Sequence, residues 1–205
     1  MDQSPSPKDL WEARYGGDGR IFGVEPNDFL RESLPLLGSG RALCLAEGEG
    51  RNAVFLAQSG FEVTAVDLAE SGVRKTLELA AQRGVHVDAH AADLADYELG
   101  ESAWELVVSI FAHMPPAVRA DLHRRVAQSL KPGGIFLLEA YTPAQIGRGT
   151  GGPPAAELTM TLADLRRELE PLEFLHAVEL EREVIEGSGH RGLGAVVQLI
   201  ARRPA

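Results

Sequence analysis

Between residues 42 and 140, short apolar segments alternate with segments of helical length, and this alternation constrains the fold more than any other feature. It predicts strands at 42–46, 61–66, 85–90, 105–110 and 135–140, with helices at 51–58, 69–83 and 116–130. Strands that alternate with helices form a parallel sheet whose two faces are both covered by helices. The chain is therefore predicted to be an α/β protein with a doubly wound, Rossmann-like sheet in three layers.

The two ends of the chain follow other patterns. Residues 1–38 are predicted to form a helical cap segment, with one helix at 9–15 and another that Asn27 or Asp28 begins and that runs to about residue 37. Residues 39–205 form the main part of what we expect to be one structural domain. Beyond residue 140 we predict a Gly/Pro-rich loop at 141–158, a helix at 161–169 and an antiparallel hairpin of strands at 172–183 and 193–201.

The first strand runs into a turn with two glycines and then directly into a helix. Gly48 and Gly50 allow a sharp bend and let a ligand approach the backbone, and the helix that follows aims its free N–H groups at the same place. With Ala53 and the downstream Asp67, the turn also satisfies the dinucleotide-binding fingerprint. The alternative is a tight strand–helix turn that binds nothing.

Acidic residues follow the next two strands. Asp67 ends the second strand, where a carboxylate can accept hydrogen bonds from both ribose hydroxyls of a nucleoside, although it could equally cap the next helix. Asp93 follows the third strand, where it could accept from an adenine amino group while Leu94 covers the ring. In open α/β sheets ligands bind at the carboxyl ends of the strands, so these positions form one predicted site.

Composition narrows the class of partner. A net charge of −10 argues against nucleic acid, because such a partner requires a basic face. The polar, proline-rich start is unlike a signal peptide, no apolar run is long enough for a membrane span, and the single Cys44 excludes an internal disulfide. We expect a cytoplasmic protein, with no metal site suggested by any Cys/His spacing.

These motifs, in their order, resemble the class I S-adenosylmethionine (SAM)-dependent methyltransferases. The resemblance rests on the glycine turn, Asp67, residues 92–94, the strand at 106–109 and the turn Leu-Lys-Pro-Gly-Gly at 130–134. It implies a mostly parallel seven-stranded sheet with an antiparallel last strand, which the terminal hairpin matches and which NAD-binding Rossmann domains lack. SAM is the implied cofactor. The residues expected to bind it are Tyr15, Phe22, Glu47, Gly48, Gly50, Arg51, Asn52, Asp67, Leu68, Asp93, Leu94, Ser109 and Ile110.

More narrowly, residues 23–30 and 47–53 look like those of the small bacterial tellurite-resistance and thiopurine-type methyltransferases. That resemblance implies a small-molecule acceptor, often a thiol or another chalcogen. Two positions depart from the family pattern. Cys44 stands where many members carry an acidic residue, and Ala46 stands where they carry glycine.

His113 follows the fourth strand and is the histidine placed where a general base could act near neutral pH. A purely packing role for it is an equally good alternative, as core packing is for Tyr15 and Phe22. The loop at 141–158 has the glycines and prolines of a substrate lid, or of a plain surface connection. Two other functions remain open, an NAD(P)-dependent reductase and a non-catalytic SAM-binding module, and the protein is expected to be a monomer or a homodimer.

Overall fold

The computed structural model describes residues 5–205, and its seven strands form one sheet in the order β3-β2-β1-β4-β5-β7-β6. The strands are β1 (Arg41–Leu45), β2 (Glu62–Asp67), β3 (Asp88–Ala91), β4 (Trp104–Ile110), β5 (Leu130–Tyr141), β6 (Glu173–Glu186) and β7 (His190–Arg202). β1 to β5 run parallel to one another, and β7 is antiparallel to both β5 and β6. The predicted mostly parallel sheet with an antiparallel last strand is confirmed.

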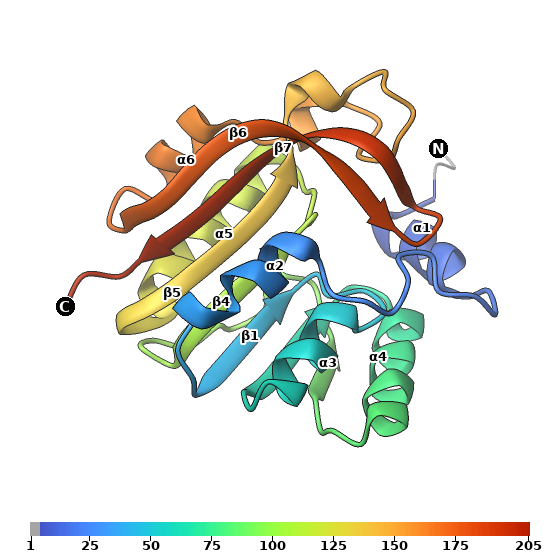
Figure 1. The fold of residues 1–205 in the computed structure, drawn as a ribbon, viewed down its shortest axis with the longest axis horizontal. Coiled ribbons are helices and arrows are strands. Elements are labelled where there is room, and N and C mark those ends of the chain that lie inside the picture. The colour runs from blue at the N-terminus through green and yellow to red at the C-terminus, as the bar shows by residue number, and fades with distance from the viewer. Residues whose placement is uncertain (1–4) are drawn as a thin grey trace.

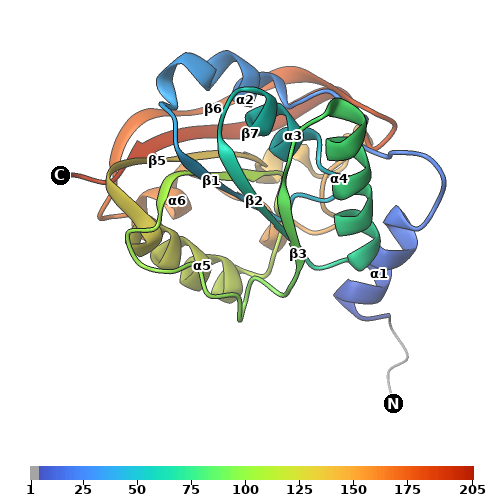
Figure 2. The same cartoon turned by 90° about the horizontal axis from the view of Figure 1, so that it is seen from below.

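Helices cover both faces of this sheet, as Figure 2 shows. They are α1 (Pro7–Tyr15), α2 (Asp28–Ser33), α3 (Arg51–Gln58), α4 (Glu70–Arg83), α5 (Pro116–Ser129) and α6 (Leu162–Glu168), with short 3-10 helices at Leu34–Leu36, Pro143–Gln145 and Ala156–Leu158. α5 and α6 lie on one face, and α2 and α3 lie on the other. The arrangement is the expected three-layer one.

Each face of the sheet has its own hydrophobic core. One core joins the sheet to α5 and α6 through Leu122, Val126 and Leu165, all almost fully buried. The other joins it to the opposite helices through Leu30 of α2, Leu56 of α3 and further apolar side chains. Because both faces are buried, the central strands are apolar at nearly every position, which explains why they are visible in the sequence as continuous apolar runs.

The third strand begins later than its sequence pattern predicts. Gly84 ends α4 in the left-handed region with φ +68°, and the next N–H, that of Val85, donates to Ala80 O. Val85 therefore belongs to the helix cap, and β3 starts only at Asp88. The predicted strand at 85–90 is too early by three residues at its start.

The last two strands are longer than predicted and form a strongly curved hairpin (Figure 1). Pairing continues from Glu173 opposite Arg202 to Glu186 opposite His190, so the tip contains only residues 187–189. The tip descends beside α1 and the segment that follows it, and there Ser188 N–H and Gly189 N–H donate to Ile21 O at 2.8 and 2.9 Å. The hairpin therefore reaches from the far edge of the sheet to the N-terminal segment.

The Lys-Pro-Gly-Gly sequence at 131–134, predicted as a turn, lies within β5. Gly133 has φ +80° and its N–H donates to Arg203 O, while Arg203 N–H donates to Gly134 O. Pairing with β4 shifts register between Trp104 and Leu106 at the same place. These residues form an irregular, paired start of the strand. Among residues 5–205, no helix has both the length and the apolar character needed to cross a membrane.

Candidate active site

The glycine turn lies at the carboxyl end of β1, and its backbone explains its sequence. Ala46, Gly48 and Gly50 all have positive φ, at 49°, 67° and 92°. A Cβ on Gly50 would stand 2.7 Å from Cα of Thr76 in α4, so a side chain there would collide with backbone. The turn can therefore form only with glycine at position 50, whether or not a ligand binds.

Ala46 occupies a left-handed conformation that costs a non-glycine residue about 1–2 kcal/mol. We therefore expect Ala46→Gly to raise the free energy of unfolding by about 0.5–1 kcal/mol, after the greater unfolded-state entropy of glycine is subtracted. Urea unfolding measures this change. The same substitution at Ala57, inside α3, should lower stability by about 1 kcal/mol. Equal losses at both positions would show that the conformation of Ala46 carries no strain.

Asp67, at the end of β2, faces the glycine turn. Its Oδ2 accepts from Gly48 N–H at 2.8 Å and its Oδ1 from Ala69 N–H at 2.9 Å. Burial raises the pKa of Asp67, and the two backbone hydrogen bonds oppose that rise. The side chain thus joins the turn to the residue that precedes α4. Since each carboxylate oxygen has two lone pairs, the group can still accept from a ligand.

Glu47 points at the start of α3, where its Oε1 accepts from Asn52 N–H at 2.9 Å and Ala53 N–H at 2.8 Å. Burial raises its pKa to about 7, although those hydrogen bonds and Arg51 favour the charged form. The residue remains partly exposed. The carboxylate satisfies the free N–H groups of the helix, and its predicted contact with the cofactor stays a prediction.

The N-terminal segment closes over this turn. Tyr15 is buried with its hydroxyl against Gly48, where a Cβ would stand 2.7 Å from the phenolic oxygen. Burial, together with the charges of Asp67 and Glu49, raises the pKa of Tyr15. The Phe22 ring lies 6.4 Å from the Tyr15 ring in an edge-on arrangement. Tyr15 therefore contacts the glycine turn, and the Phe22 ring lies beside Tyr15.

Glu49 holds that segment in place, a role that sequence reasoning missed. Its carboxylate is buried, accepts from Ile21 N–H at 2.7 Å and pairs with Lys75 Nζ at 2.9 Å. Arg20 donates to the carbonyls of Glu49 and Lys75 at 2.6 and 2.7 Å. Glu49, the middle residue of the Gly-Glu-Gly turn, thus has its hydrogen-bond and ion-pair partners within the protein.

The residues predicted after β2, β3 and β4 lie at the same edge of the sheet. Ala92 N–H donates to Asp67 O at 2.8 Å, which places the exposed Asp93 close to Asp67 and to the partly exposed Leu68. Ser109 of β4 stands opposite Leu45 of β1, directly beside the start of the turn. Two predicted residues, Leu94 and Ile110, have their side chains in the two hydrophobic cores.

Arg51 and Asn52 belong to a buried polar network. Arg51 Nη2 pairs with Glu186 Oε2 of β6 at 2.6 Å, and Asn52 Oδ1 accepts from Asn27 N–H at 2.9 Å. Asn27 caps α2 by accepting from Leu30 N–H, which settles the choice between Asn27 and Asp28. The structure thus shows protein partners for both residues, and their contact with the cofactor stays a prediction.

Glu139 is the centre of the network and is fully buried on β5. It accepts from Asn27 Nδ2 at 2.5 Å, from Gln198 Nε2 at 2.7 Å, and from Arg182 through two nitrogens at 2.7 and 2.6 Å. Glu186 accepts a further hydrogen bond from Asn27 Nδ2 at 2.8 Å. Two carboxylates and two guanidinium groups therefore balance one another in the interior.

Beside the network lies a group of rings that we call the aromatic cluster: Phe22, Phe111, His113, Tyr141 and His190. The Phe111 ring stands 4.5 Å from that of Tyr141 and 4.6 Å from that of His190, and Phe22 stands 4.7 Å from His190. His190, the first residue of β7 after the hairpin tip, is buried, although residues next to such tips are usually solvated. Because the Phe22 ring also lies beside Tyr15, the aromatic cluster adjoins the residues that are predicted to bind the cofactor.

His113 is held by its ring nitrogen Nδ1, which lies 3.0 Å from Leu158 O. A carbonyl can only accept, so Nδ1 carries the hydrogen and Nε2 has a free lone pair. Burial lowers the pKa of His113 to about 4, against the effect of that hydrogen bond. Within residues 5–205, His113 Nε2 and the Tyr141 hydroxyl are the buried side-chain polar atoms that have no hydrogen-bond partner. Both belong to the aromatic cluster.

The loop at 141–158 folds against the hairpin. Gln145 Oε1 accepts from Ala195 N–H at 2.9 Å, its Nε2 donates to Gly151 O at 2.9 Å, and Arg191 N–H donates to Thr150 O at 3.0 Å. Leu158, near its end, supplies the carbonyl that holds His113. A lid function for this loop stays a prediction.

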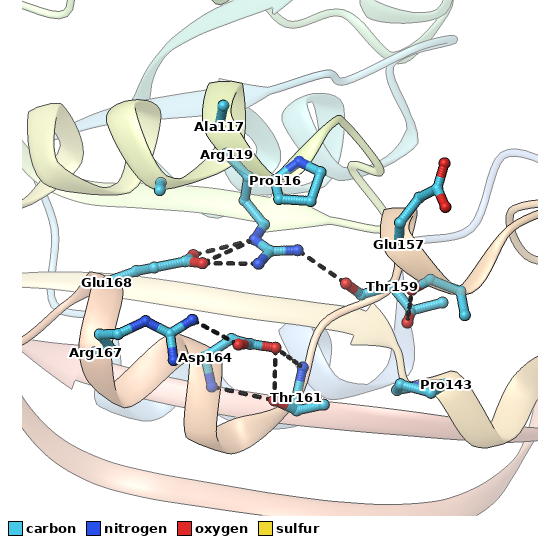
Figure 3. A pocket seen from close by; sticks show the side chains of 12 residues that line it. Pro116, Ala117, Arg119, Pro143, Glu157, Thr159, Thr161, Asp164, Arg167 and Glu168 are labelled. Carbon is cyan, nitrogen blue, oxygen red and sulfur yellow. Dashed lines mark hydrogen bonds and ion pairs between the residues drawn. The ribbon is translucent and has the colours of Figure 1, made fainter.

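A cavity of about 460 Å³ lies elsewhere, between α5, α6 and the residues just before α6 (Figure 3). Four of its five charged groups are paired: Arg119 bonds Glu168 at 2.7 Å, and Arg167 bonds Asp164 at 2.7 Å. Arg119 also donates to Thr159 O at 2.8 Å. None of the residues predicted for the site lines it. The cavity is therefore separate from the strand-end site.

The architecture and the turn together identify the fold. Residues 42–134 match the family model of a methyltransferase domain. Over 97% of this chain and 98% of the other, the structure is similar to that of N-methyltransferase NodS from Bradyrhizobium japonicum bound to S-adenosyl-l-homocysteine, with a TM-score of 0.70 and 15% identity. The chain therefore has the fold of the class I methyltransferases.

Two further proteins are similar to this chain. TehB from Haemophilus influenzae superimposes with a TM-score of 0.71 and 18% identity, covering 96% of this chain and 66% of that one. An uncharacterized methyltransferase of Synechocystis is 33% identical over 116 residues, which are 55% of this chain and 53% of the other. The chain spans about half or less of the length of the curated relatives it matches.

Proposed function

We propose that the chain is a SAM-dependent methyltransferase that transfers a methyl group to a small-molecule acceptor. The observation that carries this proposal is the contact between the glycine turn and the carboxylate that ends β2, at 2.8 Å from Gly48 N to Asp67 Oδ2. In an open α/β sheet, a nucleoside ligand binds at this edge, against such a turn and such a carboxylate. The match of residues 42–134 to a methyltransferase domain supports the same conclusion.

The residues present fit SAM. Asp67 keeps free lone pairs for ribose hydroxyls, Asp93 is exposed beside it, and Tyr15 and Phe22 cover the turn from the N-terminal segment. When bound, SAM supplies an activated methyl group. The task of the protein is then to hold the acceptor in line with that group, a positioning effect that can contribute about 7–11 kcal/mol in favourable cases.

His113 is the proposed general base. With Nδ1–H committed to Leu158 O, its Nε2 can accept a proton from the acceptor. A pKa of about 4 makes it a weak base. Weakness is no obstacle here, because an acceptor atom that has gained a methyl group becomes a strong acid and gives up its proton readily.

A non-catalytic SAM-binding module is the second candidate, and one observation favours it. In such a module bulky side chains would fill the acceptor site, and the rings of the aromatic cluster pack closely, with Phe111 stacked on Tyr141 at 4.5 Å. The unpartnered atoms of His113 and Tyr141 favour a ligand at the same place. An NAD(P)-dependent reductase shares the turn and Asp67 but gives no reason for the antiparallel β7.

Calorimetry with SAM and NADH, followed by an assay for S-adenosylhomocysteine release with thiols, phenols, amines and chalcogen oxyanions, separates these functions. We expect SAM to bind and NADH to give no measurable heat of binding. With at least one acceptor, the protein should release S-adenosylhomocysteine. SAM binding without release for any acceptor would favour the module, and NADH binding would favour the reductase.

Three further features belong to the same proposal. The acceptor is a small molecule, the net charge of −10 disfavours nucleic acid as a partner, and the protein acts in the cytoplasm as a monomer or a homodimer.

A further inference from the structure

The aromatic cluster contains two buried polar atoms that have no hydrogen-bond partner among residues 5–205, His113 Nε2 and the Tyr141 hydroxyl. Leaving a buried polar group unpaired costs about 1–3 kcal/mol, and folded proteins satisfy nearly all such groups. Tyr141 is fully buried, so bulk solvent does not reach its hydroxyl. A ligand that forms hydrogen bonds with both groups would explain why two unpaired polar atoms lie in one cluster.

Their placement suits an acceptor. Phe111 and His113 follow β4 and Tyr141 ends β5, at the edge of the sheet where Asp67 and the glycine turn also lie. The rings of His113 and Tyr141 are nearly parallel, with an interplanar angle of 16° and centroids 5.7 Å apart. A small molecule bound between their polar atoms would therefore adjoin the proposed cofactor site through Phe22 and Tyr15.

We infer that the aromatic cluster is the acceptor site and that it takes a small uncharged alcohol, phenol or thiol, whose hydrogen His113 Nε2 accepts and whose heteroatom accepts from the Tyr141 hydroxyl. This inference rests on the proposed function. The acceptor gives one lone pair to the methyl carbon, the electron pair of the broken carbon–sulfur bond stays on sulfur, and the acceptor's proton passes to His113 and then to solvent.

The number of lone pairs on the acceptor atom favours oxygen or sulfur over nitrogen at this site. Oxygen in a hydroxyl and sulfur in a thiol have two lone pairs each, so one can accept from Tyr141 while the other attacks. An uncharged amine has one lone pair, and the same hydrogen bond would occupy it. The two unpaired atoms together therefore disfavour nitrogen acceptors.

The surrounding charges select an uncharged acceptor. The neighbouring ions are paired within the protein, Arg51 with Glu186 at 2.6 Å and Arg182 with Glu139 at 2.6 Å. An oxyanion bound in the cluster would be repelled by the carboxylates of Glu186 and Glu139. It would gain no free cation, because the two buried arginines are already paired with those carboxylates. Arg14, 5.4 Å from the Phe22 ring, is exposed and its charge is screened by water.

Phe22 offers a route into the cluster, because it is partly exposed and its ring, in the N-terminal segment, lies 4.7 Å from that of His190 at an angle of 47°. That segment meets the hairpin tip through the two hydrogen bonds to Ile21 O. A displacement of Phe22 from His190 would open the cluster without disturbing either hydrophobic core.

The test compares wild type with Tyr141→Phe, using phenol and 2-mercaptoethanol as uncharged probes and tellurite and butylamine as charged ones. Binding is measured with and without S-adenosylhomocysteine, by titration and by the ¹⁵N resonance of His113 Nε2. We expect both uncharged probes to bind and to shift that resonance, and Tyr141→Phe to weaken their binding about tenfold. The variant should unfold at the same or a higher temperature, since it loses an unpaired hydroxyl.

Tyr97→Phe, outside the cluster, is the matched control and should bind the probes as wild type does. The inference is overturned if only a charged probe binds, if no probe binds, or if Tyr141→Phe binds phenol as tightly as wild type. SAM calorimetry on the same samples keeps the two proposals apart. Absence of SAM binding contradicts the methyltransferase, whereas the probe and ¹⁵N results judge the acceptor site in the cofactor-free protein as well.

Discussion

Replacing Asp67 by alanine is expected to weaken SAM binding by at least about 100-fold. Hydrogen bonds to a charged group contribute about 1.5–3 kcal/mol each, and a ribose offers two hydroxyls to this carboxylate. Loss of both exceeds the 2.8 kcal/mol that a 100-fold change requires. Isothermal titration calorimetry with SAM measures the effect directly.

The same substitution also acts on the protein, because Asp67 accepts from Gly48 N–H and Ala69 N–H. Titrations should therefore be run well below the unfolding temperature of the variant. Asp67→Asn, which keeps one accepting oxygen, should lose less affinity than Asp67→Ala. Asp88→Ala, an exposed carboxylate at the start of β3, is the control and should bind SAM as wild type does. Unchanged SAM affinity in folded Asp67→Ala would count heavily against the proposed function.

Glu139→Ala is expected to lower the free energy of unfolding by about 3–5 kcal/mol. Removing one member of a buried ion pair costs the other charge its compensation. Here the guanidinium of Arg182 would lose both of its short bonds to Glu139 and keep the longer contacts with Glu186 and Asp28, at 3.5 and 3.6 Å. Asn27 and Gln198 would each lose a partner as well. Because the network joins β5, the hairpin and the start of α2, we expect the loss to affect the whole fold.

Urea unfolding followed by circular dichroism checks this value. Glu183→Ala is a suitable control, since Glu183 is exposed on the same hairpin and should change stability by no more than about 0.5 kcal/mol. A Glu139→Ala variant as stable as wild type would mean that the network contributes no net stability. That outcome would be informative, since some buried ion pairs can be replaced at no cost.

Local patterns in the sequence were sufficient to predict the fold. Three patterns are each visible within a few neighbouring residues: strand–helix alternation, glycine where φ is positive, and apolar runs in strands that are covered on both faces. The seven-stranded sheet confirms the fold that these patterns predict. Errors fell at boundaries where tertiary contacts intervene. Val85 is apolar like a strand residue, but the cap of α4 uses its N–H.

The strand-end residues were also predictable, because parallel topology brings the ends of β1, β2 and β4 to one edge. Asp67 and Gly48 are 19 positions apart and are in direct contact. The roles of the predicted residues as cofactor or catalytic groups remain predictions. The division into a cap at 1–38 and a domain at 39–205 also remains a prediction, although Leu30 of the cap is buried in the hydrophobic core on the α3 side of the sheet.

What the sequence by itself determined is the order of the elements, the parallel sheet and the edge at which its acidic and glycine residues meet. Only the tertiary structure decided which polar groups are paired. Asn27 reaches Glu139 and Glu186, 112 and 159 positions away, and His190 at the start of β7 packs against Phe22 and Phe111. The physical reason is that secondary structure follows from neighbouring residues, whereas the partner of a buried charge or hydroxyl is set by which distant segments the packed fold brings within hydrogen-bond distance.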